Sequence, residues 1–114
     1  METLTKAAIL AFDDLKKELL TIPEWGGDVY IRVMTGIERD KYEEWAINSG
    51  KSLQGIRGRI ASLCLVDENG VRLFTDEDVD ALGQKSAAAL ERIVTAVMKL
   101  NGVTTADIKE IAGN

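Results

Sequence analysis

The residues that could carry acid–base, metal or thiol chemistry are few in this chain. None of the 114 residues is histidine, which removes the usual general base near neutral pH and the commonest metal ligand. Cys64 is the single cysteine, so the sequence excludes an internal disulfide and a zinc site built from several cysteines. These absences weigh against an enzyme, and we expect no catalytic residue.

Acidic residues around Gly70 invite comparison with a calcium-binding loop. Such a loop needs acidic ligands at its first, third and fifth positions, glycine at the sixth and a carboxylate at the twelfth. With Gly70 as the sixth position the twelfth is Asp76, but the first is Leu65, which cannot bind a cation. Asp76 and the two acids after it are better explained as the first turn of a helix capped by Thr75. We therefore expect no bound metal.

Paired carboxylates, glycines and basic residues give no other recognisable site. Glu43 and Glu44 are adjacent, so they do not share one face of a helix. The glycines match neither a phosphate-binding loop nor a dinucleotide fingerprint, and we expect no cofactor. Arg57 and Arg59 form too short a patch for nucleic acid, and nineteen acids against fourteen bases give a net charge of −5. No nucleic-acid partner is expected.

Length and composition favour one globular domain over residues 1–114. The chain is 46% hydrophobic and 29% charged, and no linker divides it. Its purely apolar runs fall far short of the roughly 20 residues needed to cross a bilayer, and no targeting signal is visible. We expect no membrane partner. A single free thiol suits a reducing cytoplasm.

The N-terminal third predicts a short helix and then a β-hairpin. Residues 1–14 favour a helix that Thr5 can cap. Residues 15–34 contain two apolar-rich runs separated by Pro23 and a glycine pair, which is typical of a hairpin turn. Alternation along the second run places Val29, Ile31 and Val33 on one face of the sheet.

Helices account for most of the remaining chain. Thr35 and Glu38 form a capping box before the first of them, and a second helix is expected over residues 53–66. On that helix Cys64 lies in the apolar stripe, as a buried structural thiol, while Arg57 and Arg59 point away. The expected fold is α+β and mostly α-helical, an N-terminal β-hairpin followed by a bundle of four to five short helices.

Three further helices complete this bundle. Thr75 and Ser86 are the expected caps of two of them. Residues 87–100 form the clearest amphipathic helix of the chain, and a glycine after Asn101 ends it. The last short helix is expected to open at Thr104. Its apolar residues are Ile108 and Ile111.

Since no catalytic pattern is present, the sequence favours a protein that works by presenting a surface. The candidate partner-binding residues are Trp25 at the hairpin tip, Tyr30 on the second strand, and the adjacent pair Leu73 and Phe74. Any exposed part of the helix near residues 93–100 is a further candidate. For each of these residues, packing into the domain's own core is the alternative explanation.

Two long blocks of sequence resemble one known family. The first runs over residues 23–32 and 35–40, with the sequences PEWGGDVYIR and TGIERD, and the second over residues 66–79, with the sequence VDENGVRLFTDEDV. Leu82, residues 85–86 and residues 100–102 extend the second block. In this order they resemble the tail assembly chaperones of long-tailed bacteriophages and prophages, and the likeness covers about residues 15–111.

The resemblance implies a role as well as a fold. Members of that family act in the cytoplasm of the infected host, coat the aggregation-prone tape measure protein, and bring tail tube subunits to it. They are absent from the finished virion. Many are made in two lengths through a ribosomal frameshift, and this chain would be the shorter product. Tape measure protein, tail tube protein and further copies of the same chain are therefore the implied partners.

Two other classes of protein remain compatible with the sequence. One is a minor structural tail-completion or head–tail connector protein, which would be found in purified virus particles. The other is a small bacterial regulator or enzyme subunit, which the absence of histidine and of a basic surface disfavours.

Overall fold

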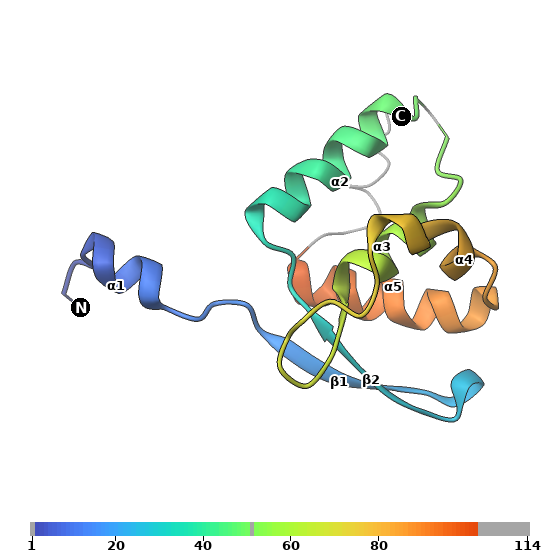
Figure 1. Ribbon diagram of the computed structural model, residues 1–114, viewed down its shortest axis with the longest axis horizontal. Coiled ribbons are helices and arrows are strands. Elements are labelled where there is room, and N and C mark those ends of the chain that lie inside the picture. The colour runs from blue at the N-terminus through green and yellow to red at the C-terminus, as the bar shows by residue number, and fades with distance from the viewer. Residues whose placement is uncertain (1, 51, 103–114) are drawn as a thin grey trace.

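The computed structural model describes residues 2–50 and 52–102, and its architecture is α+β and mostly helical (Figure 1). The fold class is therefore confirmed. The expected helix that opens at Thr104 and carries Ile108 and Ile111 lies outside the described residues. The elements are α1 (Lys6–Ala11), β1 (Lys17–Ile22), β2 (Gly27–Arg32), α2 (Gly36–Asn48), α3 (Ile56–Cys64), β3 (Leu65–Val66), α4 (Val79–Gly83) and α5 (Ala87–Asn101), with short 3₁₀ turns η1 (Pro23–Trp25) and η2 (Asp76–Asp78).

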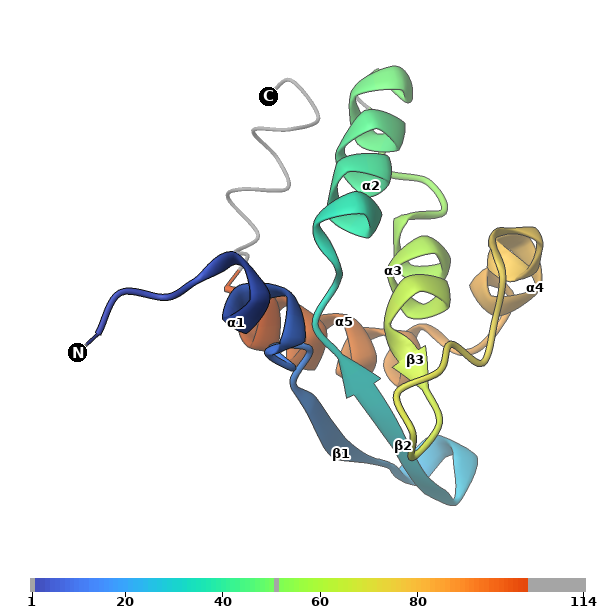
Figure 2. The ribbon, with the colours of Figure 1, turned by 60° about the vertical axis from the view of Figure 1, so that its left-hand side comes forward.

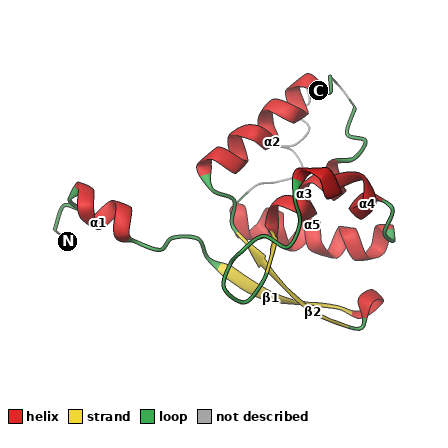
Figure 3. Cartoon of the chain, viewed as in Figure 1, coloured by secondary structure: helices red, strands yellow, loops and turns green. Residues whose placement is uncertain are grey.

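A three-stranded antiparallel sheet in the order β1-β2-β3 supports the helices (Figure 3). The hairpin of β1 and β2 is in register from the pair Lys17 and Arg32 to the pair Ile22 and Gly27. Gly26 closes the turn with a φ of 70°, a left-handed conformation that only glycine adopts without strain. The predicted hairpin is confirmed.

The core lies between the sheet and the helices α3 and α5, which contact each other (Figure 2). Ile22 and Ile31 of the sheet are fully buried, and so are Ile93 and Val97 of α5. The clear helical spacing of apolar residues in α5 thus corresponds to a buried stripe. Gly102, with a φ of 70°, ends this helix, as expected from the sequence.

Local capping signals were predicted well. Thr35 and Glu38 form the expected capping box of α2, in which the Thr35 hydroxyl accepts from the Glu38 amide at 3.1 Å. Thr75 caps η2, and the Ser86 hydroxyl accepts from the Ala89 amide at 3.1 Å. Each cap is a short-range interaction, so its residues are recognisable in the sequence.

The second helix is shorter than expected, and its end is a strand. The predicted helix over residues 53–66 spans only Ile56–Cys64, and Leu65–Val66 form β3, paired with Tyr30 and Ile31. A short apolar run fits a buried strand or a buried helix equally well, so periodicity does not separate them. Arg59 was also wrongly expected to point away, because its guanidinium lies over the Trp45 ring, 5.0 Å from the centroid.

The N-terminal helix is confirmed but covers only Lys6–Ala11 of the expected 1–14. Thr5 caps it, accepting from the Ala8 amide at 3.1 Å. None of its residues is buried, and in Figure 1 it stands apart from the rest of the fold. The radius of gyration is 15.1 Å, above the roughly 13 Å typical of a compact chain of this length.

Cys64 is buried in the core, as the sequence predicts, and we expect it to resist alkylation in the folded protein. Burial raises the pKa of its thiol to about 12, and the thiolate is the reactive form. Treatment with iodoacetamide at about pH 8 should leave the folded protein unmodified, while concentrated guanidinium should allow complete labelling. Mass spectrometry measures both. Rapid labelling of the folded protein would contradict the buried position.

Alkaline pH should weaken the fold through the same thiol. The unfolded chain ionises Cys64 near pH 9, whereas the folded chain does so only near pH 12, so between these values the unfolded state binds fewer protons. The free energy of unfolding should fall by up to about 1.4 kcal/mol per pH unit. The pKa of Tyr42, also raised by burial to about 12, adds to this loss. Denaturant titrations at several pH values measure this loss. In Cys64→Ala the free energy of unfolding should fall less steeply between pH 9 and pH 12. An unchanged dependence on pH would contradict the assignment to Cys64.

Candidate functional site

Trp25 and Phe74 line one apolar cavity of about 290 Å³ at the hairpin tip, hereafter the Trp25 cavity. Its other lining residues come from η2, α4 and the chain just after α4: Asp78, Ala81, Leu82 and Lys85. Trp25 is 37% exposed, so its indole is neither buried in the core nor free of contact. An apolar hollow beside an exposed tryptophan is typical of a site that binds an apolar side chain.

The hairpin tip is fixed by an ion pair to α5. The Arg92 guanidinium donates to both carboxylate oxygens of Glu24, at 2.8 and 3.1 Å. This contact lowers the pKa of Glu24 below its usual value. Because Glu24 precedes Trp25 within η1, the ion pair joins this turn to α5, while Trp25 shares a cavity with Ala81 and Leu82 of α4.

Phe74 reaches the cavity through the connection that follows β3. The amide of Leu73 donates to the Leu65 carbonyl at 3.0 Å, which ties this segment to the sheet. Leu73 is 53% exposed, whereas Phe74 is half-buried and packs against the core cluster. Thr75 then caps η2 and directs the chain into α4, whose buried Val79 and Leu82 attach it to the core.

The four candidate partner-binding residues therefore separate into two groups. Trp25 and Phe74 meet at the Trp25 cavity. Tyr30 is half-buried, with the Lys17 ammonium 5.2 Å from its ring centroid, and Leu73 lies exposed; neither lines this cavity. The binding of a partner by these residues stays a prediction.

A second apolar surface, on the N-terminal segment, was missed by sequence reasoning. Four large apolar side chains of residues 2–14 are more than half exposed: Leu4, Ile9, Leu10 and Phe12. Apolar residues in a short amphipathic segment are normally taken as part of the core, so the sequence alone gives no signal that they stay uncovered. Their exposure suits contact with another protein.

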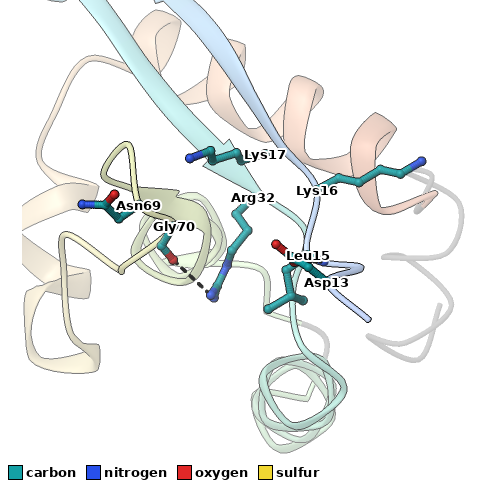
Figure 4. Close-up of a pocket in the computed structure, with 7 residues that line it drawn as sticks. All are labelled: Asp13, Leu15, Lys16, Lys17, Arg32, Asn69 and Gly70. Carbon is teal, nitrogen blue, oxygen red and sulfur yellow. Dashed lines mark hydrogen bonds between the residues drawn. The ribbon is translucent and has the colours of Figure 1, made fainter. Parts of the chain in front are cut away.

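A polar cavity of about 310 Å³ lies where the N-terminal segment joins β1 (Figure 4). Its basic residues Lys16 and Lys17 point in different directions. The Arg32 guanidinium is already bonded to both Glu38 oxygens, at 2.7 and 2.8 Å, and to the Gly70 carbonyl at 3.3 Å. The cavity thus lacks a convergent set of donors for an anion, and Arg32 serves to join β2 to α2.

Neither a metal site nor a membrane span appears in the described part of the chain. Across residues 2–50 and 52–102, no three His, Cys, Asp or Glu side chains gather closely enough to hold a metal ion. Leu65, which occupied the first position of the calcium-loop alignment, is buried in β3. Of the helices in these ranges, none has the length and apolar character to cross a bilayer.

The fold is shared with a protein of known structure. The chain is similar to the bacteriophage HK97 tail assembly chaperone, with a TM-score of 0.63 and 13% sequence identity. The match covers 88% of this chain and 91% of the other. No family model and no curated protein matches the sequence. At this identity the comparison establishes a shared fold.

Proposed function

We propose that this chain is a tail assembly chaperone of a long-tailed bacteriophage or prophage. The observation that carries the proposal is the shared fold with the HK97 tail assembly chaperone over about nine-tenths of both chains. The blocks of sequence at residues 23–32, 35–40 and 66–79, which resemble this family, are consistent with it. They contain η1 with Trp25 and the Phe74 segment, which form the Trp25 cavity.

In this role the chain would bind the tape measure protein in the host cytoplasm, keep it soluble, and promote assembly of the tail tube protein around it. Exposed apolar side chains at the N-terminal segment and at the Trp25 cavity provide contacts for an apolar client. The net charge of −5 would help keep the complex soluble. If several copies bind along one client, or to one another, their weak contacts together would give tighter binding than one copy alone.

Co-expression with the tape measure protein from the same gene cluster tests this proposal. We expect the client to move from the pellet to the supernatant and to co-purify with several copies of this chain. Mass spectrometry of purified virus particles separates the proposal from a structural tail-completion or head–tail connector role. A chaperone is absent from the particles, whereas a stoichiometric amount in them would overturn the proposal.

We expect Trp25→Ala to weaken client binding while leaving the fold nearly unchanged. The indole is 37% exposed at the hairpin tip, so its removal should alter the free energy of unfolding by no more than about 1 kcal/mol. Trp45→Ala is the matched control. Trp45 packs on the core with Arg59 over its ring, and its loss should cost about 3 kcal/mol. Thermal unfolding measures both; a large fall in Tm for Trp25→Ala would assign that residue to the core.

A further inference from the structure

β1 forms one edge of the sheet, and its outer side is open (Figure 2). The Val33 amide donates to the Lys16 carbonyl at 2.9 Å, and hydrogen-bonded pairs alternate along an antiparallel ladder. The N–H and C=O groups of Lys17, Leu19 and Thr21 therefore point away from β2. Within the described ranges no other backbone group meets them. An edge of this kind accepts a further strand.

The opposite edge of the sheet, at β3, is already closed. The chain after β3 folds back on it, so that the Leu73 amide donates to the Leu65 carbonyl at 3.0 Å and the Asp67 amide to the Val71 carbonyl at 2.8 Å. No such cover lies on β1 in the described part of the chain, and Leu19 is 53% exposed there. Proteins usually protect an edge strand with charges or proline, but the centre of β1, with the sequence LLT, carries neither.

Charge favours a second copy of β1 as the added strand. Lys17 lies at one end of the outer face of the hairpin, and Asp28, paired in register with Thr21, lies at the other. Among the residues that the structure describes, neither is in an ion pair. A two-fold axis at Leu19 places Lys17 of each copy opposite Thr21 of the other, with Asp28 on the next strand. Each Lys17 thus approaches a carboxylate of the other copy.

This register also brings the two Leu19 side chains together at the axis. If the Lys17 residues of two copies paired instead, their ammonium groups would lie opposite each other, which destabilises an antiparallel pair. A slip by one residue would set the outward backbone groups of one copy against groups that already bond to β2 in the other. The pairing centred on Leu19 is therefore the favoured one.

An apolar groove beside the same edge adds side-chain contacts to this pairing. The groove has a volume of about 550 Å³ and lies between β1 and α5, where Leu20, Ala88 and Ala96 form its apolar walls. Backbone hydrogen bonds alone contribute little net affinity, since the free edge bonds to water. The two-fold axis sets the groove of one copy next to that of the other, so the interface includes α5 as well as the strands.

We propose that two copies of this chain join β1 to β1, antiparallel and centred on Leu19, so that their sheets become one continuous sheet. Both copies use the same surface, so the assembly closes as a dimer. This inference goes beyond the proposed function, because the dimer needs no client.

Sedimentation velocity of the full chain at up to about 1 mM measures the dimer, because a pair with a Kd of about 100 μM is mostly dimeric at that concentration. Leu19→Pro removes an outward N–H but no hydrogen bond within the hairpin, and proline is tolerated on edge strands. Leu73→Lys is the matched control, because Leu73 is also 53% exposed but lies beside β3. Circular dichroism measures whether both variants fold.

We expect the unaltered chain and Leu73→Lys to dimerise and Leu19→Pro to stay monomeric. Leu19→Lys keeps the N–H but places two ammonium groups at the axis, so it should dimerise at least about tenfold more weakly even if Leu19→Pro fails to fold. An unaltered chain that is monomeric throughout this range would overturn the proposal, and so would a folded variant at Leu19 that dimerises as strongly as the unaltered chain. A monomeric chain would leave the edge to another occupant.

Hydrogen exchange locates the interface on β1. The Leu19 and Thr21 amides should exchange at least about fivefold more slowly when the protein is concentrated enough to dimerise. The Leu20 amide already lies in the ladder with Val29, so its exchange should not change. Dimerisation without added protection of Leu19 and Thr21 would contradict the pairing of these edges.

A disulfide tests the register. Cα atoms of a hydrogen-bonded pair lie about 5.5 Å apart, within reach of a disulfide, and the buried Cys64 does not compete. In oxidised glutathione, Leu19→Cys should form a linked dimer quickly. Thr21→Cys, which lies opposite Lys17 of the other copy, should do so much more slowly. Equal rates would rule out a pairing centred on Leu19.

These outcomes are separate from those that test the chaperone role. If the chain dimerises through β1 but the tape measure protein still aggregates, the dimer stands and the proposed function fails. If the tape measure protein is kept soluble by a chain that does not dimerise through β1, the proposed function stands and the inference about β1 fails.

Discussion

Ile93→Asp is expected to unfold the domain. Ile93 lies at the centre of the core on α5, with no solvent exposure, and α5 contacts α3 and both strands of the hairpin. A carboxylate placed there would have no partner, and a buried unpaired charge costs more than about 4 kcal/mol. Small domains are stable by only about 5–15 kcal/mol. Most molecules of the variant should therefore be unfolded, and no cooperative unfolding transition should be seen.

Circular dichroism and near-ultraviolet spectra measure this loss. Thr95→Asp is the control, since Thr95 is exposed on the same helix and should change the free energy of unfolding by no more than about 0.5 kcal/mol. Val97→Asp should behave like Ile93→Asp, because Val97 is also fully buried. A folded Ile93→Asp with a normal thermal transition would contradict the position of α5 in the core.

Gly58→Ala is expected to destabilise the domain by about 3 kcal/mol, because α3 and α4 approach each other closely at this residue. A Cβ at Gly58 would collide with the Val79 carbonyl oxygen and lie 3.1 Å from the Gly83 nitrogen. These are backbone atoms, so a side-chain rotation cannot relieve the contact. The whole of α4, which carries the wall of the Trp25 cavity, would have to move.

Gly83→Ala is the matched control for this contact. A Cβ at Gly83 would meet no atom within 4 Å, and the residue does not need a positive φ. We expect this substitution to be neutral or to stabilise the helix by up to about 1 kcal/mol. Urea titration of both variants gives the comparison. Equal stability of Gly58→Ala and the unaltered protein would contradict the close packing of α3 and α4.

The parts of the fold that depend on neighbouring residues could be predicted from the sequence. Pro23 and the glycine pair define the hairpin turn, and Thr35, Thr75 and Ser86 cap their helices through contacts two or three residues along the chain. Such interactions are specified by a few adjacent side chains. Residue type and spacing therefore suffice to recognise them.

The parts that depend on distant residues could not be predicted. Leu65 and Val66 form a strand because β2 lies beside them, and nothing in their own sequence separates this outcome from the end of a helix. Gly58 is required because α4 packs against it, a contact that only the folded chain reveals. Trp25 and Phe74 were each identified as candidates, but their meeting at one cavity follows from the tertiary arrangement.

The exposure of the N-terminal segment is another feature that could not be predicted from the sequence. Its apolar side chains would be assigned to the core by composition alone, yet Leu4, Leu10 and Phe12 are at least 70% exposed. A helix of six residues is too short to be stable in isolation, and none of its residues is buried against the rest of the chain. The apolar composition of this segment is evident from the sequence, but its exposure is evident only from the folded structure.

Light scattering tests most directly the proposed role of this chain, which is to keep an aggregation-prone tail protein soluble. The tape measure protein from the same gene cluster is diluted from denaturant with increasing amounts of this chain, and the scattered intensity is followed over time. We predict that scattering is suppressed in proportion to the added chain and that a soluble complex of several copies per client forms. A client that aggregates equally with and without the chain would contradict the account.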